Sequence, residues 1–177
     1  MNTKKLIFAL VLFLSGASIL AAQTDQLPER GTPVPETTNG VPHVQIGVAP
    51  EPVLSQKLLD RVAQLPGVTL GPTRVSLPGA VGFQLDENTP LAHPEVIVGG
   101  REFAHLHPDG SLHASLDPKL AKEAVRTGWA ISHPWAFQRE GWEGFVMIYT
   151  PKTEPELDVV VRLVEQSYAF VTGQNVD

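Results

Sequence analysis

The sequence predicts an α+β domain in which helices pack on an antiparallel sheet to form two layers. Helical patterns near both ends of the domain flank a region of short apolar runs. Glycine and proline separate those runs, as they do between short strands. A histidine-rich segment after residue 101 has the turn sequence and the alternation of a hairpin. With 177 residues, 42% of them hydrophobic, the chain fits one compact domain.

The N-terminus has the pattern of an export signal. Lys4 and Lys5 precede an apolar stretch, residues 6–22, that ends in small side chains. The stretch is also just long enough to act as an uncleaved membrane anchor. We therefore expect residues 1–22 to be a signal peptide or membrane anchor. The domain is then exported, either periplasmic or secreted, or tethered to the membrane through residues 6–22.

Residues 23–52 are expected to form a proline-rich linker. Six of the 16 prolines lie in this stretch, and such a density sustains neither a helix nor an inner strand. His43 falls here and is expected to be a solvated linker residue. The folded domain is then residues 53–177.

Each element of the domain has its own signal. Ser55 is expected to cap a helix over residues 56–65, which Pro66-Gly67 ends. Apolar residues between turn residues predict short strands over residues 68–85, and residues 96–98 predict another. The remaining expected elements are a hairpin of residues 101–107 and 111–116, a helix over 118–127 with Asp117 as N-cap, an inner strand over 144–150, and a final helix over 154–171.

The hairpin places histidines on one face. A three-residue loop ending at Gly110 would pair His107 with Ser111 and His105 with His113. A two-residue turn would instead move His113 to the other face, but only the longer loop makes both strands alternate consistently. Side chains alternate along strands, so one face is expected to carry Phe103, His105, His107, Ser111, His113 and Ser115. The other is expected to be the core face, with Ala104, Leu106, Leu112, Ala114 and Leu116.

Two chemistries suit these histidines, and a structural or solvated role stays open beside them. Imidazole titrates near neutral pH, so His105, His107, His113 and His133 are candidates to take a proton from a phenol or enol. The set His105, His107 and His113 also suits a metal ion. Glu102 is a candidate buried acid, with an exposed strand start as the alternative.

The aromatic residues and the overall charge limit the class of molecule that the protein is expected to bind. Trp129, Trp135 and Tyr149 are close in sequence to His133 and are expected to form a wall for a small aromatic or enolic molecule. A formal net charge of -6 argues against nucleic acid as a partner. The absence of cysteine excludes thiol enzymes and cysteine-ligated metals. No nucleophile-elbow, phosphate-loop or zincin motif is present.

Four motifs in order resemble a known family. They are Arg74-x-Ser76-Leu77-Pro78-Gly79, EFAHLHPDGSLHASL from residue 102, GWAISHP from residue 128, and VMIYTPKTEPELDVVVRLVEQSYAFVTG from residue 146. Together, over residues 53–173, they resemble the luciferase-like domain, which is associated with the fungal bioluminescence luciferase.

The resemblance implies an α+β domain behind an N-terminal hydrophobic segment. It also implies oxidation of a hydroxylated α-pyrone by molecular oxygen, with no flavin and no required metal. The chain departs from the family pattern at Ile131, where members carry an acidic residue, and at Pro151-Lys152, where they have Pro-Arg. The lost acid weakens a role for His133 as an oriented base, and light emission is not expected.

The function expected from the sequence is histidine-assisted oxidation of a phenolic or enolic molecule by molecular oxygen, without a cofactor. The alternative is a non-catalytic envelope module that uses the histidines to bind a ligand or a metal. The expected catalytic residues are His105, His107, His113 and His133, and the expected substrate-binding residues are Arg74, Trp129, Trp135 and Tyr149.

Overall fold

The computed structural model describes residues 26–176, so the expected signal segment, residues 1–22, lies outside the described residues. The described part contains a six-stranded antiparallel sheet with the order β1-β2-β3-β4-β6-β5. In chain order its elements are α1 (Pro52–Val62), β1 (Val68–Pro72), β2 (Val81–Leu85), the 3-10 helix η1 (Pro94–Val96), β3 (Glu102–Leu106), β4 (Leu112–Ser115), α2 (Pro118–Arg126), β5 (Ala130–Ser132), β6 (Phe145–Ile148) and α3 (Glu154–Thr172).

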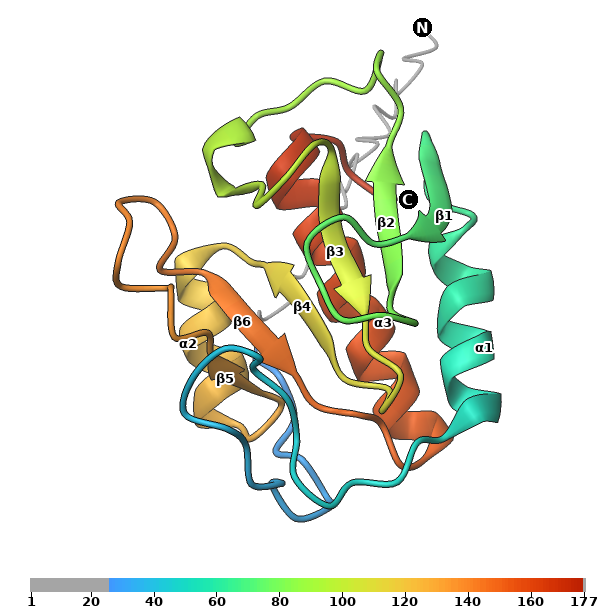
Figure 1. Ribbon diagram of the computed structural model, residues 1–177, viewed down its shortest axis with the longest axis vertical. Coiled ribbons are helices and arrows are strands. Elements are labelled where there is room, and N and C mark those ends of the chain that lie inside the picture. Colours follow the sequence, from blue (N-terminus) through green and yellow to red (C-terminus); the bar gives the residue numbers. More distant parts are fainter. Residues whose placement is uncertain (1–25, 177) are drawn as a thin grey trace, which may run out of the picture.

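Helices and sheet form two layers, which confirms the predicted α+β class. In Figure 1, α2 and α3 lie behind the sheet and α1 stands beside it, next to β1. α3 packs on α1 and across β3 and β4. Large side chains such as Phe83, Leu112 and Tyr168 are fully buried between the layers. The later part of residues 26–51 and the β1–β2 loop cross the front of the sheet (Figure 1), whereas Gln26 and Leu27 lie on the helix side, beside α2 and α3. The front face is therefore covered by irregular chain, and this is the face that carries the histidines.

The β3–β4 hairpin has the predicted register. His105 pairs with His113 and Ala104 with Ala114. The loop is closed by the hydrogen bond from His107 N to Ser111 O, at 2.7 Å, and Gly110 has a φ of +87°. That left-handed conformation is the one the three-residue loop requires, and glycine adopts it without strain.

One residue of this hairpin lies on the face opposite to the predicted one. Phe103 was expected beside the histidines, but its ring packs on Phe83 and on Tyr168 of α3, within the core. The cause is a β-bulge. Phe83 pairs with Ala104 while the next residue, Gln84, pairs with Glu102, so Phe103 is the extra residue of β3. The bulge reverses the alternation and brings Glu102 to the histidine face.

Two expected elements are different in the structure. α1 begins at Pro52 rather than after Ser55, and no side chain caps it, because a proline is favoured at the first helical position and starts the helix earlier. The stretch expected as a strand over residues 96–98 instead begins with the last residue of η1 (Pro94–Val96) and continues as irregular chain. β5 was not predicted, since three residues are too few to show an alternating pattern.

Side chains cap the N-termini of α2 and α3. The Asp117 side chain accepts a hydrogen bond from Lys119 N at the start of α2, as predicted. Thr153 does the same for Glu156 N at the start of α3, and Gly173 ends that helix in the left-handed conformation. Among residues 26–176, no helix has the length and apolar character that crossing a membrane requires.

The proline-rich segment packs on the domain instead of standing away from it. Leu27 is buried, and the Trp129 indole donates a hydrogen bond to Pro28 O at 2.6 Å. Further along, the Gln45 side chain donates to Thr150 Oγ1 at 2.7 Å. Prolines prevent a helix or an inner strand, but they do not prevent irregular chain from packing. The described residues 26–52 are therefore irregular, as their prolines predict, and they pack on the domain.

A close approach between β4 and β6 gives one prediction. The Gly144 carbonyl accepts a hydrogen bond from Leu116 N at 3.0 Å, and a Cβ on Gly144 would lie 1.8 Å from Leu116 O. We expect Gly144→Ala to lower the free energy of unfolding by roughly 3 kcal/mol or more, because the backbone must separate to admit a methyl group. The check is urea unfolding beside the control Gly71→Ala, a β1 position where an added Cβ meets nothing within 4 Å. Equal midpoints for the two variants would contradict it.

Candidate functional site

Five of the six histidines gather on the front face of the sheet. They are His43 in the proline-rich segment, His105 in β3, His107 just after β3, His113 in β4 and His133 just after β5. Each is buried, with no more than 6% of its surface exposed. We call these five residues the histidine cluster. The four histidines predicted as catalytic therefore come together, and a fifth joins them.

His133 reaches the cluster through the short turn after β5. Its backbone N donates to Phe145 O at 2.9 Å, which extends the pairing of β5 with β6 by one residue. Its ring then lies 4.7 Å from that of His113, centroid to centroid. The side-chain Nδ1 of His133 accepts a hydrogen bond from Trp135 N at 3.1 Å. The turn therefore brings His133 to the histidine face.

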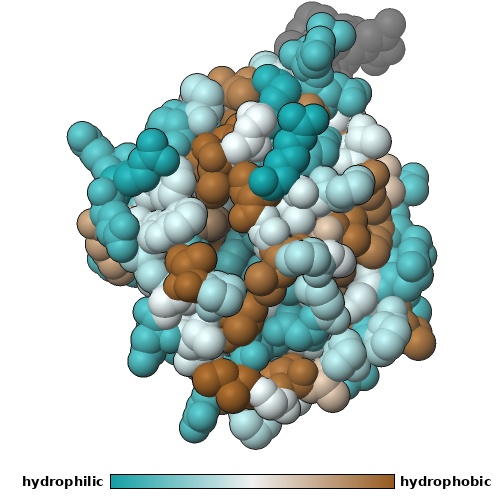
Figure 2. Space-filling view, in the orientation of Figure 1, coloured by the Kyte–Doolittle hydropathy of each residue, from teal (hydrophilic) through white to brown (hydrophobic). Residues whose placement is uncertain are grey.

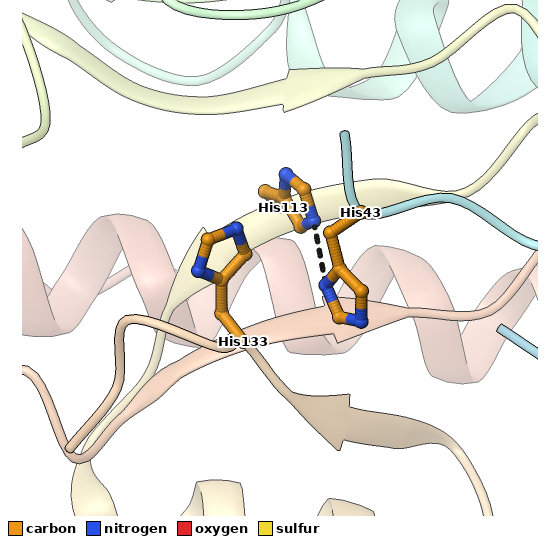
Figure 3. A group of neighbouring side chains, drawn as sticks. All are labelled: His43, His113 and His133. Atoms are coloured by element: carbon orange, nitrogen blue, oxygen red, sulfur yellow. Dashed lines mark hydrogen bonds between the residues drawn. The ribbon is translucent and has the colours of Figure 1, made fainter. Parts of the chain in front are cut away.

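His43 was expected to be a solvated linker residue, and this expectation is wrong. Its side chain is 3% exposed, and its Nδ1 lies 3.3 Å from His113 Nε2. Figure 3 shows His43 reaching down from the proline-rich segment towards His113 and His133. A bridge between Thr37 and Gln45 folds the segment back on itself and holds His43 in place. No hydrophobic periodicity marks this segment, since two of its buried side chains, His43 and Gln45, are polar.

Glu102 is the buried acid that the sequence left undecided. One of its oxygens lies 3.0 Å from His105 Nδ1, and the carboxylate side chain is fully buried. It also accepts hydrogen bonds from Thr73 Oγ1 and Arg74 N. Gly82, opposite His105, makes room for it, because a Cβ there would lie 2.7 Å from the carboxylate. Burial raises the pKa of Glu102, but the hydrogen bonds from His105, Arg74 and Thr73 outweigh it and lower the pKa. Glu102 is therefore an anion that holds the proton of His105 on Nδ1.

A second carboxylate orients His107 through a serine. Ser111 Oγ donates to Asp109 Oδ1 at 2.7 Å, so its oxygen is left to accept. His107 Nδ1 lies 3.0 Å from that oxygen and must therefore carry the proton. The Nε2 of His107 then has a lone pair, and no residue in the described part of the chain hydrogen-bonds to it.

The environment keeps most of the cluster uncharged. Burial lowers the pKa of His107 to about 4, and repulsion from His105 contributes. Burial and repulsion from His43 lower the pKa of His133 to about 4 as well. The pKa of His113 is held well below its usual range by burial and by the four imidazoles around it. Burial lowers the pKa of His43 too. These imidazoles are therefore neutral at pH 7 and available as bases or metal ligands.

A cavity of about 320 Å³ opens on the cluster. All five clustered histidines line it, together with an apolar wall of Val41, Pro42, Val75, Leu77, Val98, Trp135 and Phe145. The space-filling view shows this face hollowed near its centre, with hydrophobic side chains on the rim (Figure 2). A volume at the lower end of the range of ligand pockets suits a small molecule. A larger cavity of about 640 Å³ lies between α2 and α3 and has no histidine in its lining.

The predicted substrate-binding residues divide into two groups. Trp135 lines the cavity, as expected. Trp129 and Tyr149 instead lie around the Arg30 guanidinium, 5.4 and 5.9 Å from it, and do not line the cavity. Arg74 is exposed and contributes only its backbone N, to Glu102. Closeness in sequence to His133 did not predict the lining, because both rings pack around Arg30 of the proline-rich segment, a contact that no local sequence pattern shows.

Two groups of three histidines lie close enough for one metal ion. They are His105, His107 and His113, and His43, His113 and His133. Within each group the possible ligand nitrogens lie within 4.8 Å of one another. His113 is common to both, so one ion at a time is the natural occupancy.

Comparison with known proteins relates the chain to fungal luciferases. Residues 100–167 match the luciferase domain family. The luciferase of Armillaria gallica is 30% identical over 168 residues, which are 83% of this chain and 62% of that protein. The luciferases of Armillaria mellea and Neonothopanus nambi are 37% and 35% identical over about half of this chain and about a third of their own length.

The chain spans less than two thirds of the length of these relatives. No solved structure matches the chain significantly. The matched domain contains four of the five clustered histidines and Glu102, while His43 precedes it. Residues 100–167 are therefore similar to the luciferase domain, and the chain shows distant homology to the fungal luciferases of Armillaria and Neonothopanus.

Proposed function

We propose that the protein oxidises a small enolic or phenolic molecule with molecular oxygen in the histidine cavity. The observation that carries the proposal is the convergence of five buried histidines on one apolar-walled cavity. The distant homology to proteins named luciferases supports it, since such enzymes oxidise a small organic compound. Oxidation, and not light emission, is the activity proposed for this chain.

In the proposed reaction a histidine takes the hydroxyl proton of the substrate. His107 is the best placed, because Asp109 and Ser111 fix its proton on Nδ1 and leave the Nε2 lone pair free. The resulting enolate carbon attacks molecular oxygen and forms one C–O bond. The peroxide anion then takes the proton back from His107 and leaves a hydroperoxide. Carbon is oxidised by two electrons and oxygen is reduced to the peroxide level, so atoms and electrons balance.

The low pKa of His107 limits the substrate to an acidic hydroxyl. An imidazole with a pKa of about 4 accepts a proton from an ordinary phenol, whose pKa is about 10, only at a cost of roughly 8 kcal/mol. An enol conjugated to a carbonyl is far more acidic. The cavity therefore favours conjugated enols such as hydroxypyrones over simple phenols.

The setting of this activity is also a proposal. The N-terminal pattern of residues 1–22 supports export to the periplasm or the medium, with a membrane tether through residues 6–22 if the segment is not cleaved. The acidic charge supports a small-molecule partner over nucleic acid.

Oxygen uptake with a series of hydroxypyrones tests the reaction. We expect substrate-dependent uptake by the wild type, and a drop in kcat/KM of roughly 10²–10⁴-fold in His107→Gln. His93→Gln is the matched control, because His93 is half-exposed and stacks on Phe170 outside the cavity; it should keep the wild-type rate. Equal rates in wild type and His107→Gln would refute His107 as the base. Melting-temperature shifts without any oxygen uptake would instead indicate a module that binds the ligand without turnover.

A further inference from the structure

We propose that His105, His107 and His113 form a site for one divalent transition-metal ion. The two possible three-histidine groups are not equivalent, because the hydrogen bonds of each imidazole decide which nitrogen has a lone pair. A ligating nitrogen must be unprotonated, and its partner nitrogen must find an acceptor for its proton. The first group meets both conditions and the second does not.

Two of the ligands are backed by carboxylates. Glu102 accepts from Nδ1 of His105, and Asp109 acts on His107 through Ser111. In both residues the proton is therefore on Nδ1 and the lone pair on Nε2. A carboxylate behind a histidine is the usual outer arrangement at metal sites, where it fixes the ring and strengthens the ligand.

His113 completes the group. Its Nδ1 lies 3.1 Å from His105 Nε2, and two nitrogens bound to one ion at 2.0–2.1 Å in a tetrahedral site are separated by about 3.3 Å. If His113 Nδ1 holds the ion, its proton is on Nε2, where His43 Nδ1 accepts it at 3.3 Å. His43 thus stands behind His113 as a hydrogen-bond acceptor and is not a ligand.

The alternative group fails at His133. Its Nδ1 accepts the hydrogen bond from Trp135 N, so in the neutral ring the proton is on Nε2 and no lone pair is left for an ion. This excludes His43, His113 and His133 as the ligand set while that hydrogen bond is kept. His133 and, with the ion bound, His43 then each have an Nε2–H group to donate to an anion in the cavity.

Three imidazoles without thiolate or carboxylate suit zinc, copper, iron or nickel rather than magnesium or calcium. Three protein ligands leave a coordination position free, as in catalytic sites. The consequence for the reaction rests on the proposed function. The Nε2 lone pair of His107, which otherwise takes the proton, would hold the ion, and the charge of the ion would acidify a bound hydroxyl. That would extend the substrates to weaker acids such as phenols.

The site is tested by metal binding without substrate. The full chain is purified without a polyhistidine tag, stripped with a chelator and titrated with Co²⁺, whose visible absorption reports coordination by imidazole. We expect saturable 1:1 binding by the wild type and by the control His93→Gln. Loss of 1:1 binding is expected in His105→Gln and His107→Gln. Glu102→Gln, which keeps all three ligands, is expected to weaken binding roughly 10–100-fold.

His133→Gln separates the two ligand sets, since it should still bind Co²⁺ in a 1:1 ratio. The proposal is overturned if the stripped wild type does not bind Co²⁺ in a 1:1 ratio. It is equally overturned if His133→Gln loses binding while His107→Gln, folded by circular dichroism, retains it. Oxygen uptake by the stripped and the reloaded protein is measured separately, so failure of the oxidation does not count as failure of the metal site.

Discussion

Replacing Arg30 by methionine is expected to lower the free energy of unfolding by about 3–5 kcal/mol and to free the proline-rich segment from the sheet. Arg30 lies 3.1 Å from Glu156 of α3, and the two side chains are only 2% and 7% exposed. Its Nη2 also donates to Thr150 O at 2.8 Å. Removal of the Arg30 guanidinium leaves the Glu156 carboxylate buried without a cationic partner. Removing only one member of a buried ion pair is more costly than replacing both.

The site should respond to the same change. Arg30 links residues 26–51 to α3 and to Thr150, just after β6, and this segment supplies His43. We expect amide exchange to accelerate across residues 26–51 in Arg30→Met. The segment should also be cleaved sooner by limited proteolysis, while the exchange in β3 and β4 changes less.

Two controls separate this effect from a general loss of charge. Arg126→Met breaks exposed pairs with Glu123 and with Glu29 of the same segment, and should cost less than about 1 kcal/mol. The double variant Arg30→Met, Glu156→Met should recover part of the loss, because it leaves no buried charge. Urea unfolding measures all three. A loss in Arg30→Met no larger than in Arg126→Met would show that the buried pair does not hold the segment.

The metal-free protein is expected to lose stability steeply between pH 6.5 and pH 4. The pKa values of His107 and His133 are lowered from 6.5 to about 4 in the folded state. Over that range the unfolded chain binds more protons than the folded one, so stability falls as the pH falls. The loss amounts to about 3 kcal/mol for His107 alone. Above pH 7 these groups are neutral in both states and contribute no pH dependence.

Urea unfolding of the chelator-treated protein from pH 7.5 to pH 4 provides the measurement. His107→Gln removes one of the titrating groups and should flatten the curve by about 3 kcal/mol over the range. His93→Gln should not, because its half-exposed ring lies outside the histidine cluster. If wild-type stability were constant from pH 7.5 to pH 4, the histidines could not be held neutral by burial.

Local signals in the sequence predicted much of the site. The turn His107-Pro108-Asp109-Gly110 determines the register that places His105 opposite His113, and alternation then predicts a shared face. Asp117 predicted the start of α2 in the same way. These predictions hold because they depend on neighbours within a few residues, whose geometry the backbone fixes.

Three features of the site depend on contacts that no local pattern contains. The bulge at Phe103 brings Glu102 under His105, and it depends on how β2 pairs with β3. His43 enters the site because Gln45 and Arg30 bind residues more than a hundred positions away. Trp129 and Tyr149 were expected at the cavity, but they surround Arg30 instead.

The sequence by itself therefore determined the fold class, the hairpin register and four histidines of the cluster, because residue periodicity and turn chemistry act over short distances. The tertiary structure alone decided which carboxylate orients which histidine, and that the proline-rich segment supplies the fifth. Those contacts depend on long-range packing, in which polar side chains become buried because partners from distant parts of the chain satisfy their hydrogen bonds. The tautomers that distinguish one three-histidine group from the other follow from those same bonds.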